Sequence, residues 1–475
     1  MVNIVAGGII CFIGFIFSLY FTLRPARVFR HVWLSMSTAP IISVALLLAT
    51  QVISFQDSFR AIVGIDSLRP YTIIILFQSL AYLCLSLNQT GVLKWLSISM
   101  MANAGSSYKK IFVYIFILAT FLTVFTSNDI VILTLTPIVC HLSADAALDP
   151  IPLLFVQFFS ANTVSTIFFF SNPTNIVVSD AYGLTFWSYV QWMLLPSIAA
   201  GVALLMSLFW VFRREFSMQQ EILKLSHHPL LDQVDVKTII PNRIMAGISV
   251  GFFSLCLFGI VLSSLIGIAP WVVCLCFGAT MFVIDLTVDV VNSYPNVKFQ
   301  RVLKIAESVP FGVTPFILGM FILVEALNVL TLTGKVSVLL AELCGQFGVV
   351  FSTFFVLVLS MLFCNLINNQ PMTILFVGII KQEQFLSTLQ DVAGPEEAIR
   401  IARAIMFSIV LGSNFGANIT FIGSLAGILW KSILFVNFQI DVSLRQFFRL
   451  GMFCMAVVVL TSGAVLALEV VFDLM

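Results

Sequence analysis

Charged side chains are scarce in this chain. Of its 475 residues only 9% are Asp, Glu, Lys or Arg, whereas 60% are hydrophobic. Soluble domains carry about a quarter charged residues, so this composition excludes an ordinary soluble protein and indicates an integral membrane protein. The formal net charge of +1 gives no basic field for nucleic acid, and no nucleic-acid partner is expected.

The chain also lacks paired cysteines and clusters of metal ligands. Its nine cysteines are scattered, mostly within apolar runs, and none forms a CxxC pair. Small buried apolar side chains explain them better than a disulfide or zinc framework does. The sequence contains no nucleotide-binding glycine loop either. We therefore expect no metal and no cofactor.

Long apolar runs are what the chain has instead. Runs near 20 residues, each long enough to cross a hydrocarbon core of about 30 Å, recur along its whole length. The first run precedes three arginines rather than following them, which favours a retained span over a cleaved signal. The predicted spans are 3–23, 32–53, 71–90, 151–182, 185–212, 244–266, 270–290, 309–330, 402–432 and 450–472. Two further apolar pieces, 111–142 and 349–381, are each broken at the centre by a polar motif. Each is either two crossings or a re-entrant hairpin.

Loop charges predict the orientation of these spans. With the N-terminus outside, 17 of the 23 Lys and Arg residues fall in inner loops, which are 24–31, 94–110, 213–243, 298–304 and 431–449. This excess follows the positive-inside rule and predicts a non-cytoplasmic N-terminus. The plasma membrane is the expected location. Residues 213–243 then form a cytoplasmic linker, and residues 382–400 form an outer loop.

Polar motifs interrupt the apolar sequence in both halves. Ser127-Asn128-Asp129 matches Asn368-Asn369-Gln370, and Ser171-Asn172-Pro173 matches Gly412-Ser413-Asn414. The matched asparagines are 241 and 242 residues apart, so one shift relates the two halves. Paired interrupted segments in two halves point to the substrate site of a transporter. Because five spans precede the linker, the halves enter the membrane in opposite orientations.

The fold expected is an all-α polytopic membrane protein. It has two inverted-topology repeats, residues 1–212 and 244–475, joined by the linker 213–243. Together they contain about ten transmembrane helices and four segments that polar motifs interrupt.

Asp129 is the most informative side chain. A carboxylate within a membrane segment is costly and usually faces a cavity, so it is a candidate for proton coupling. The alternative is a helix-start cap, for which Ser127, Asn128 and Asp129 all suit. Glu325 in the span 309–330 is a second candidate for proton coupling. A position near the outer water interface explains it equally well.

Asparagines make up the neutral part of the constellation. Amides both donate and accept hydrogen bonds, which suits a hydroxylated solute or a cation bound through oxygen. Interhelical amide pairing explains any single asparagine in a membrane helix, but not six in related breaks. The expected substrate-binding residues are Ser127, Asn128, Asp129, Ser171, Asn172, Thr174, Asn175, Asn368, Asn369, Thr373, Ser413, Asn414, Asn418 and Thr420.

At these motifs the chain resembles the ArsB-type arsenite efflux permeases of the ion transporter superfamily. The matching segments are 127–129 with 135–139, 171–172 with 175–177, 368–373, and 419–420 with 422–426, in the same order and spacing. The wider superfamily includes dicarboxylate and citrate carriers, and membership of it implies two inverted repeats with two re-entrant hairpins and two unwound helices. The resemblance implies arsenite or antimonite efflux, with protons as the exchanged ion.

The chain departs from the resembled family at several positions. The family usually has an acid near Asn162, an acid and a lysine near Asn414 and Asn418, and proline at Phe421. Neutral amides replace these charges here, so Asp129 is the one acid in the central motifs. Transport of arsenite, a neutral trihydroxide at neutral pH, is compatible with this change.

Other functions were weighed against this one. A cation-coupled carrier of a carboxylate or inorganic anion is the first alternative, although the four motifs contain no Lys or Arg. An uncoupled channel also stays open. An enzyme would need a paired catalytic constellation, which Asp129 alone does not make. Two protein partners stay open as well: a second copy of the chain, and an ATPase subunit on the basic inner loops.

Overall fold

The computed structural model describes residues 4–29, 32–64, 69–102, 107–225, 239–263, 265–293 and 299–473. Among them the only strands are β1 (Ala26–Phe29) and β2 (Val32–Leu34), which pair antiparallel. Helices make up nearly all of the rest. The predicted class, an all-α polytopic membrane protein, is confirmed. Residues 226–238 of the predicted linker 213–243 lie outside the described residues.

Helices of the first half run from α1 to α10, and α11 follows at the start of the predicted linker. Most of them begin after a polar or proline-containing connection and continue through apolar sequence, whereas α11 is rich in charged and polar residues. They are α1 (Ile4–Leu23), α2 (Thr38–Ala49), α3 (Phe55–Val63), α4 (Pro70–Gln89), α5 (Val92–Ala102), α6 (Tyr108–Phe125), α7 (Asn128–Asp145), α8 (Pro150–Val164), the 3₁₀ turn η1 (Phe169–Ser171), α9 (Pro173–Ala181), α10 (Phe186–Val211) and α11 (Arg213–Leu225).

Helices of the second half follow a similar order. Here a single helix, α17, takes the place of α5 and α6, with a break at Gly348, whose φ is 75°. The elements are α13 (Arg243–Ser263), α14 (Pro270–Ser293), α15 (Gln300–Ser308), α16 (Val313–Val329), α17 (Leu332–Ile367), α18 (Asn369–Ile380), α19 (Glu383–Ala393), α20 (Pro395–Gly416), η2 (Phe421–Gly423), α21 (Leu425–Phe438) and α22 (Leu444–Phe472).

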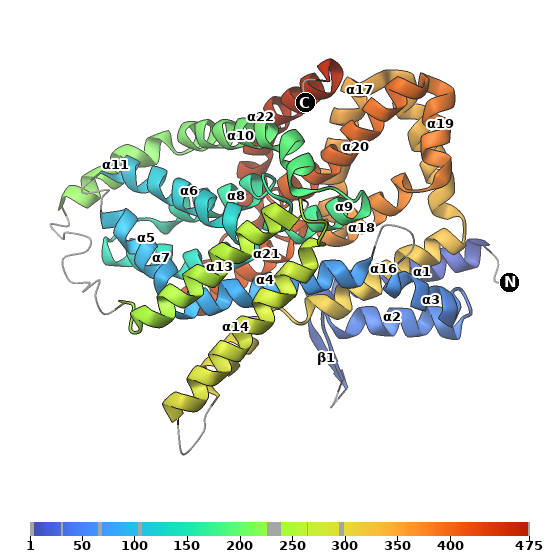
Figure 1. The fold of residues 1–475 in the computed structure, drawn as a ribbon. Helices are drawn as coiled ribbons and strands as arrows, with labels where there is room; N and C mark the ends of the chain where they lie inside the picture. The colour runs from blue at the N-terminus through green and yellow to red at the C-terminus, as the bar shows by residue number, and fades with distance from the viewer. Residues whose placement is uncertain are drawn as a thin grey trace.

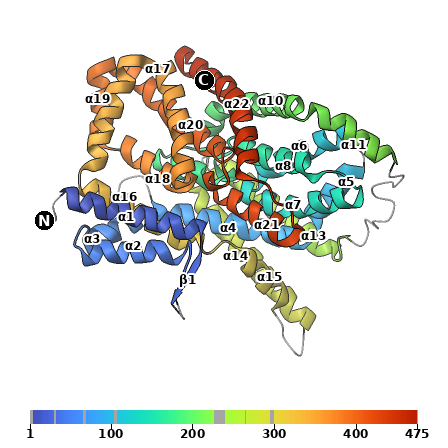
Figure 2. The ribbon, with the colours of Figure 1, turned by 180° about the vertical axis from the view of Figure 1, so that it is seen from behind.

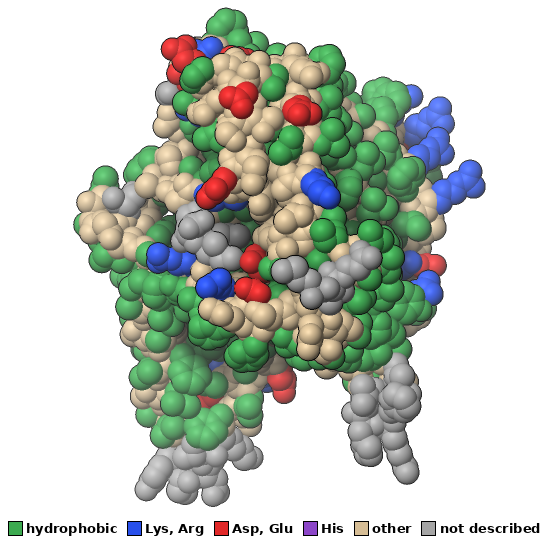
Figure 3. Space-filling view, turned by 90° about the vertical axis from the view of Figure 1, so that its right-hand side faces the viewer, with side chains coloured by type: hydrophobic (Ala, Val, Ile, Leu, Met, Phe, Trp, Pro, Cys, Tyr) green, Lys and Arg blue, Asp and Glu red, His purple; other side chains and the backbone are tan. Residues whose placement is uncertain are grey.

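Ten helical segments of the described chain are long and apolar enough to cross a membrane. Many of their apolar side chains face outward, among them Phe12, Met206 and Leu460, each more than 60% exposed. Figure 3 shows such hydrophobic side chains over much of one face of the molecule. An exposed apolar surface of this extent is what contact with lipid requires.

The molecule is organised around tightly packed helix pairs, including α17 with α20, α10 with α22 and α4 with α14. α8, α18 and α20 lie around the centre of the molecule, while α14 projects from its body (Figures 1 and 2). Small residues at the contacts let the paired helices approach each other closely. A Cβ added at Gly412 of α20 would lie 2.5 Å from the Ser360 Cβ of α17, so glycine is required there.

Three sequence-based expectations about elements were wrong. The predicted span 32–53 contains β2 and the 12-residue α2, because the β-hairpin uses its first residues and Gln51 turns the chain with a φ of 55°. The inner loop 94–110 holds most of α5. The outer loop 382–400 contains α19, an amphipathic helix that buries Phe385 and Leu389.

The helix starts keep one spacing of the predicted repeat and change the other. α7 begins at Asn128 and α18 at Asn369, which preserves the spacing of 241. Asn172, however, caps the helix after η1, and Ser424 holds that place after η2. Their spacing is 252, because α19 lengthens the second half. The counterpart of Asn172 is therefore Ser424, and Asn414 corresponds to Asn162.

Candidate functional site

The first helix break lies between α8 and α9. Asn172 has extended backbone, as expected for a residue before proline, and Pro173 then begins α9. The Asn172 Oδ1 accepts a hydrogen bond from the Thr174 N–H at 3.2 Å, which caps the helix. The Asn172 Nδ2 is left free to bond elsewhere.

The second break lies between α20 and α21. Thr420 caps the 3₁₀ turn by accepting from the Ile422 N–H at 3.2 Å, and Ser424 caps α21 through the Gly427 N–H at 3.2 Å. Both capping residues are extended. The non-helical backbone that the sequence predicted at both breaks is therefore present and buried in protein, where it is tolerated.

The residues that precede α7 and α18 cap these helices differently. Asn368 has a φ of 70° and caps α18 by accepting from the Gln370 N–H at 3.4 Å. Ser127 is extended but makes no side-chain cap, so the first N–H groups of α7 keep their positive field. The cap expected of Ser127 is absent.

Asn414 joins the two halves. Its Oδ1 accepts from the Asn172 Nδ2 and from the Ser165 Oγ, each at 2.7 Å. Its Nδ2 donates to the Asn175 Oδ1 at 2.7 Å and to the Val410 carbonyl at 2.7 Å. All four side chains are buried. One amide of the second half therefore holds three polar side chains of the first.

A second chain of amides runs through Asn162. Its Oδ1 accepts from the Asn128 Nδ2 at 3.0 Å, and its Nδ2 donates to the Asn418 Oδ1 at 3.1 Å. The Asn418 Nδ2 in turn donates to the Thr163 Oγ1 at 3.0 Å. Asn414 lies in the last turn of α20 and Asn418 lies two residues after that helix ends, so both chains meet at the end of α20. We call these two chains of residues the amide network.

Several predicted residues lie at the edge of the amide network. Ser413 donates to the Thr174 Oγ1 at 3.1 Å, and Ser171 to the Val124 carbonyl at 2.8 Å. Thr420 donates to the Asn365 Oδ1 at 2.7 Å, and Asn368 to the Ile422 carbonyl at 3.0 Å. These contacts fix the break residues to neighbouring helices.

Four other predicted residues, Thr373, Asn369, Asp129 and Glu325, are not joined to the amide network by a side-chain hydrogen bond. Thr373 donates to the Asn369 carbonyl within α18, and Asn369 is buried at the start of that helix. Asp129 is half-buried next to Asn128. Glu325 lies elsewhere, in a cavity of about 340 Å³ between α16, α18 and the start of α19, and accepts from the Asn328 Nδ2 at 2.9 Å.

The structure adds residues that the sequence did not single out as site members. Ser165, Asn162 and Thr163 complete the amide network, and Asn365 braces the second break. Lys431 of α21 places its Nζ 4.9 Å from the centre of the Phe421 ring, at the second break. In the sequence, all five are polar or charged residues that lie within one or two helical turns of a break, and this position could have identified them.

Comparison with known proteins agrees with this architecture. Residues 28–394 match the family described as citrate transporter. The arsenical pump membrane protein of Escherichia coli (strain K12) is 28% identical over 405 residues, which cover 84% of this chain and 86% of that protein. An uncharacterized transporter of Synechocystis sp. is 23% identical over 445 residues, covering 91% and 92%. The 46 kDa membrane protein of Mycobacterium leprae is 20% identical over 433 residues, covering 91% and 93%.

These matches confirm the resemblance that the motifs predicted. The family match covers well over half of the chain, and the three relatives span most of its length. Together with the broken helices and their shared polar centre, they identify a membrane transporter. The chain belongs to the citrate transporter family.

Proposed function

We propose that this transporter exports arsenite or antimonite as the neutral trihydroxide, in exchange for protons. The observation that carries the proposal is the uncharged character of the amide network. Its side chains are amides and hydroxyls, and no Lys or Arg among the described residues bonds to them. The relatives named arsenical pump membrane proteins support the same substrate class.

A trihydroxide matches the hydrogen-bonding capacity of amides. Each hydroxyl group both donates and accepts, as each amide does through its Nδ2 and Oδ1. In this structure the amides bond to one another, so a solute can enter by exchanging those bonds for its own. Such an exchange leaves no buried polar group unpaired, which keeps its free-energy cost small. A neutral solute also avoids the desolvation penalty of an ion.

Asp129 supplies the proposed proton coupling. It follows Asn128, which belongs to the amide network, and it lies in the first turn of α7. The uncapped N–H groups of that turn stabilise the ionised carboxylate. Solute at the amide network and a proton at Asp129 are then close enough to influence each other.

Anion transport is the second candidate, and Lys431 is the observation that favours it. Its ammonium group lies against Phe421 at the second break, where a carboxylate solute could reach it. Citrate is multiply charged at neutral pH, so a single cation would need help from helix N-termini or co-bound cations.

Transport by the purified protein in liposomes separates these candidates. The solutes are arsenite, antimonite, citrate, sulfate and silicic acid, each tested with an imposed proton gradient, a sodium gradient or none. We expect transport of arsenite and antimonite that responds to the proton gradient. Citrate or sulfate transport without arsenite transport would favour the anion carrier.

A further inference from the structure

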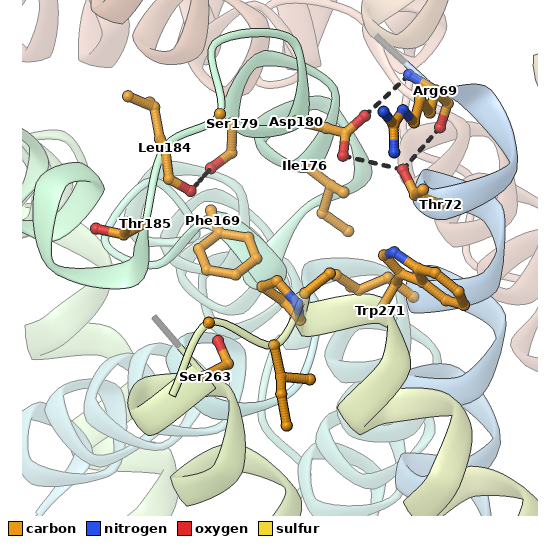
Figure 4. A pocket seen from close by; sticks show the side chains of 16 residues that line it. Arg69, Thr72, Phe169, Ile176, Ser179, Asp180, Leu184, Thr185, Ser263 and Trp271 are labelled. Atoms are coloured by element: carbon orange, nitrogen blue, oxygen red, sulfur yellow. Dashed lines mark hydrogen bonds between the residues drawn. The ribbon is translucent and has the colours of Figure 1, made fainter. Parts of the chain in front are cut away.

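A cavity of about 470 Å³ lies against α9, on the side of the first break that faces away from the amide network. It is enclosed by the start of α4, by η1 and α9, by the α9–α10 turn and by the α13–α14 turn (Figure 4). A water molecule occupies about 30 Å³ of liquid, so a small solute fits with several waters. Phe169, Ile176 and Trp271 provide its apolar walls.

Polar side chains lead from the amide network to this cavity. Asn172, Asn175 and Ser179 are three and four residues apart, a spacing that places them along one side of α9. Asn172 and Asn175 both bond to Asn414, whereas Ser179 lines the cavity. A solute moving along α9 therefore meets a hydrogen-bonding group at every turn.

Asp180 equips the cavity to bind hydroxyl groups. Its Oδ1 accepts from the Thr72 Oγ1 at 2.9 Å and its Oδ2 from the Arg69 N–H at 3.1 Å (Figure 4). Each oxygen keeps acceptor capacity for a further donor. The Arg69 side chain is exposed. Arg69 also lines the cavity and its charge offsets that of Asp180, so the cavity suits a neutral solute whose hydroxyls donate to the carboxylate.

We propose that this cavity is a release vestibule that binds a neutral polyhydroxylated solute on the non-cytoplasmic side. The inference rests on the proposed function and adds a second binding site to it. Loop charges predict that residues 69, 183–185, 263 and 267–271, which line the cavity, face that side. The solute passes from the amide network along α9 to Asp180 and then to water.

Thiol labelling tests the position of the vestibule without using the solute. Ser179→Cys is made in a Cys276→Ser background, since Cys276 is the exposed native cysteine and the other eight are buried. A membrane-impermeant, positively charged thiosulfonate is added from outside or from inside. We expect modification from outside, with loss of transport. Gln390→Cys on α19 is exposed and predicted on the same side, so it should be modified without effect on transport.

Counterflow kinetics of Asp180→Ala test binding. Losing one hydrogen-bond acceptor of the solute costs about 1 kcal/mol, so the half-saturating outer concentration should rise about fivefold. The half-saturating inner concentration should stay unchanged, a directional difference that a mere folding defect does not produce. An equal change on both sides, or no change, overturns the vestibule.

The labelling outcomes separate this inference from the proposed function. Modification of Ser179→Cys only from inside, or modification from outside that leaves transport intact, overturns the vestibule. If the liposome assay finds another hydroxylated solute in place of arsenite, the proposed function fails. Block of that solute by outer modification would still support the vestibule.

Discussion

Asn414 is the side chain through which the two halves depend on each other. Asn414→Leu keeps a similar volume but removes every hydrogen bond that the amide makes. The Asn172 Nδ2, the Ser165 Oγ and the Asn175 Oδ1 would then lose a buried partner. We expect a loss of about 2 kcal/mol in stability and no solute binding.

Thermal unfolding in detergent and binding by the purified protein measure these two effects. Asn437→Leu is the matched control, since Asn437 is an exposed residue of α21. It should leave both properties near those of the parent. Full solute binding by Asn414→Leu would show that the amide network is structural only.

Asp129→Asn tests the coupling role. The substitution keeps the size of the side chain and an oxygen at the start of α7 but cannot titrate. Folding and surface expression should stay near the parent, while transport no longer responds to a proton gradient. Liposomes with imposed pH gradients measure that response.

Asp145→Asn, at the exposed end of the same helix, is the control for Asp129→Asn. It should keep the response to the proton gradient. If Asp129→Asn keeps gradient-driven transport, proton coupling resides at Glu325 or is absent. Failure of Asp129→Asn to fold would assign the carboxylate a structural role.

Lys431→Gln separates the two candidate substrate classes. The substitution removes the one cation that contacts Phe421 among the described residues. A neutral trihydroxide makes no use of that charge, so arsenite transport should change by less than about twofold. A carboxylate solute would instead lose a charge-assisted hydrogen bond. Arsenite uptake into inside-out vesicles is the measurement. A collapse of arsenite transport with normal expression would contradict the neutral-solute proposal.

At the scale of elements, Asp289 shows how one helix holds another. Its carboxylate accepts from the Arg301 N–H at 3.1 Å and the Val302 N–H at 2.9 Å, which caps α15 from a neighbouring helix. Asp289→Ala should cost about 1 kcal/mol and lower the Tm without changing which solutes are transported. Thermal unfolding measures it, with the exposed Asp391→Ala as control. An unchanged Tm would show that water replaces the cap.

The breaks were predictable from sequence because Ser-Asn-Pro and Asn-Gln-Pro runs cannot continue a helix cheaply. The partners of Asn414 were not, since Ser165 and Asn175 come from a distant part of the chain. Pairing the asparagines of the two halves by a single spacing gave Asn172 the wrong counterpart. That pairing assumed connections of equal length between the breaks, but α19 lengthens the connection in the second half. The short α2 was missed because hydropathy alone does not register the turn at Gln51.

At the scale of the whole molecule, the inverted relation of residues 1–212 and 244–475 stays a prediction. It requires the linker inside and both termini outside. Alkaline phosphatase fused after residue 475 should be active, whereas a fusion within 226–238 should not. Activity in the linker fusion would contradict the orientation. Superposition of the two halves should also place Asn128 opposite Asn369 across a pseudo-two-fold axis.

The shared bonding of Asn414 restricts how the two halves can diverge in evolution. The Asn175 Oδ1 accepts from the Asn414 Nδ2, so an aspartate at 414 would set two acceptors face to face. A relative with an acid at that position therefore needs a donor in place of Asn175, or a cation between the two oxygens. Substitutions at 175 and 414 should consequently occur in pairs across the family, although the two positions lie 239 residues apart.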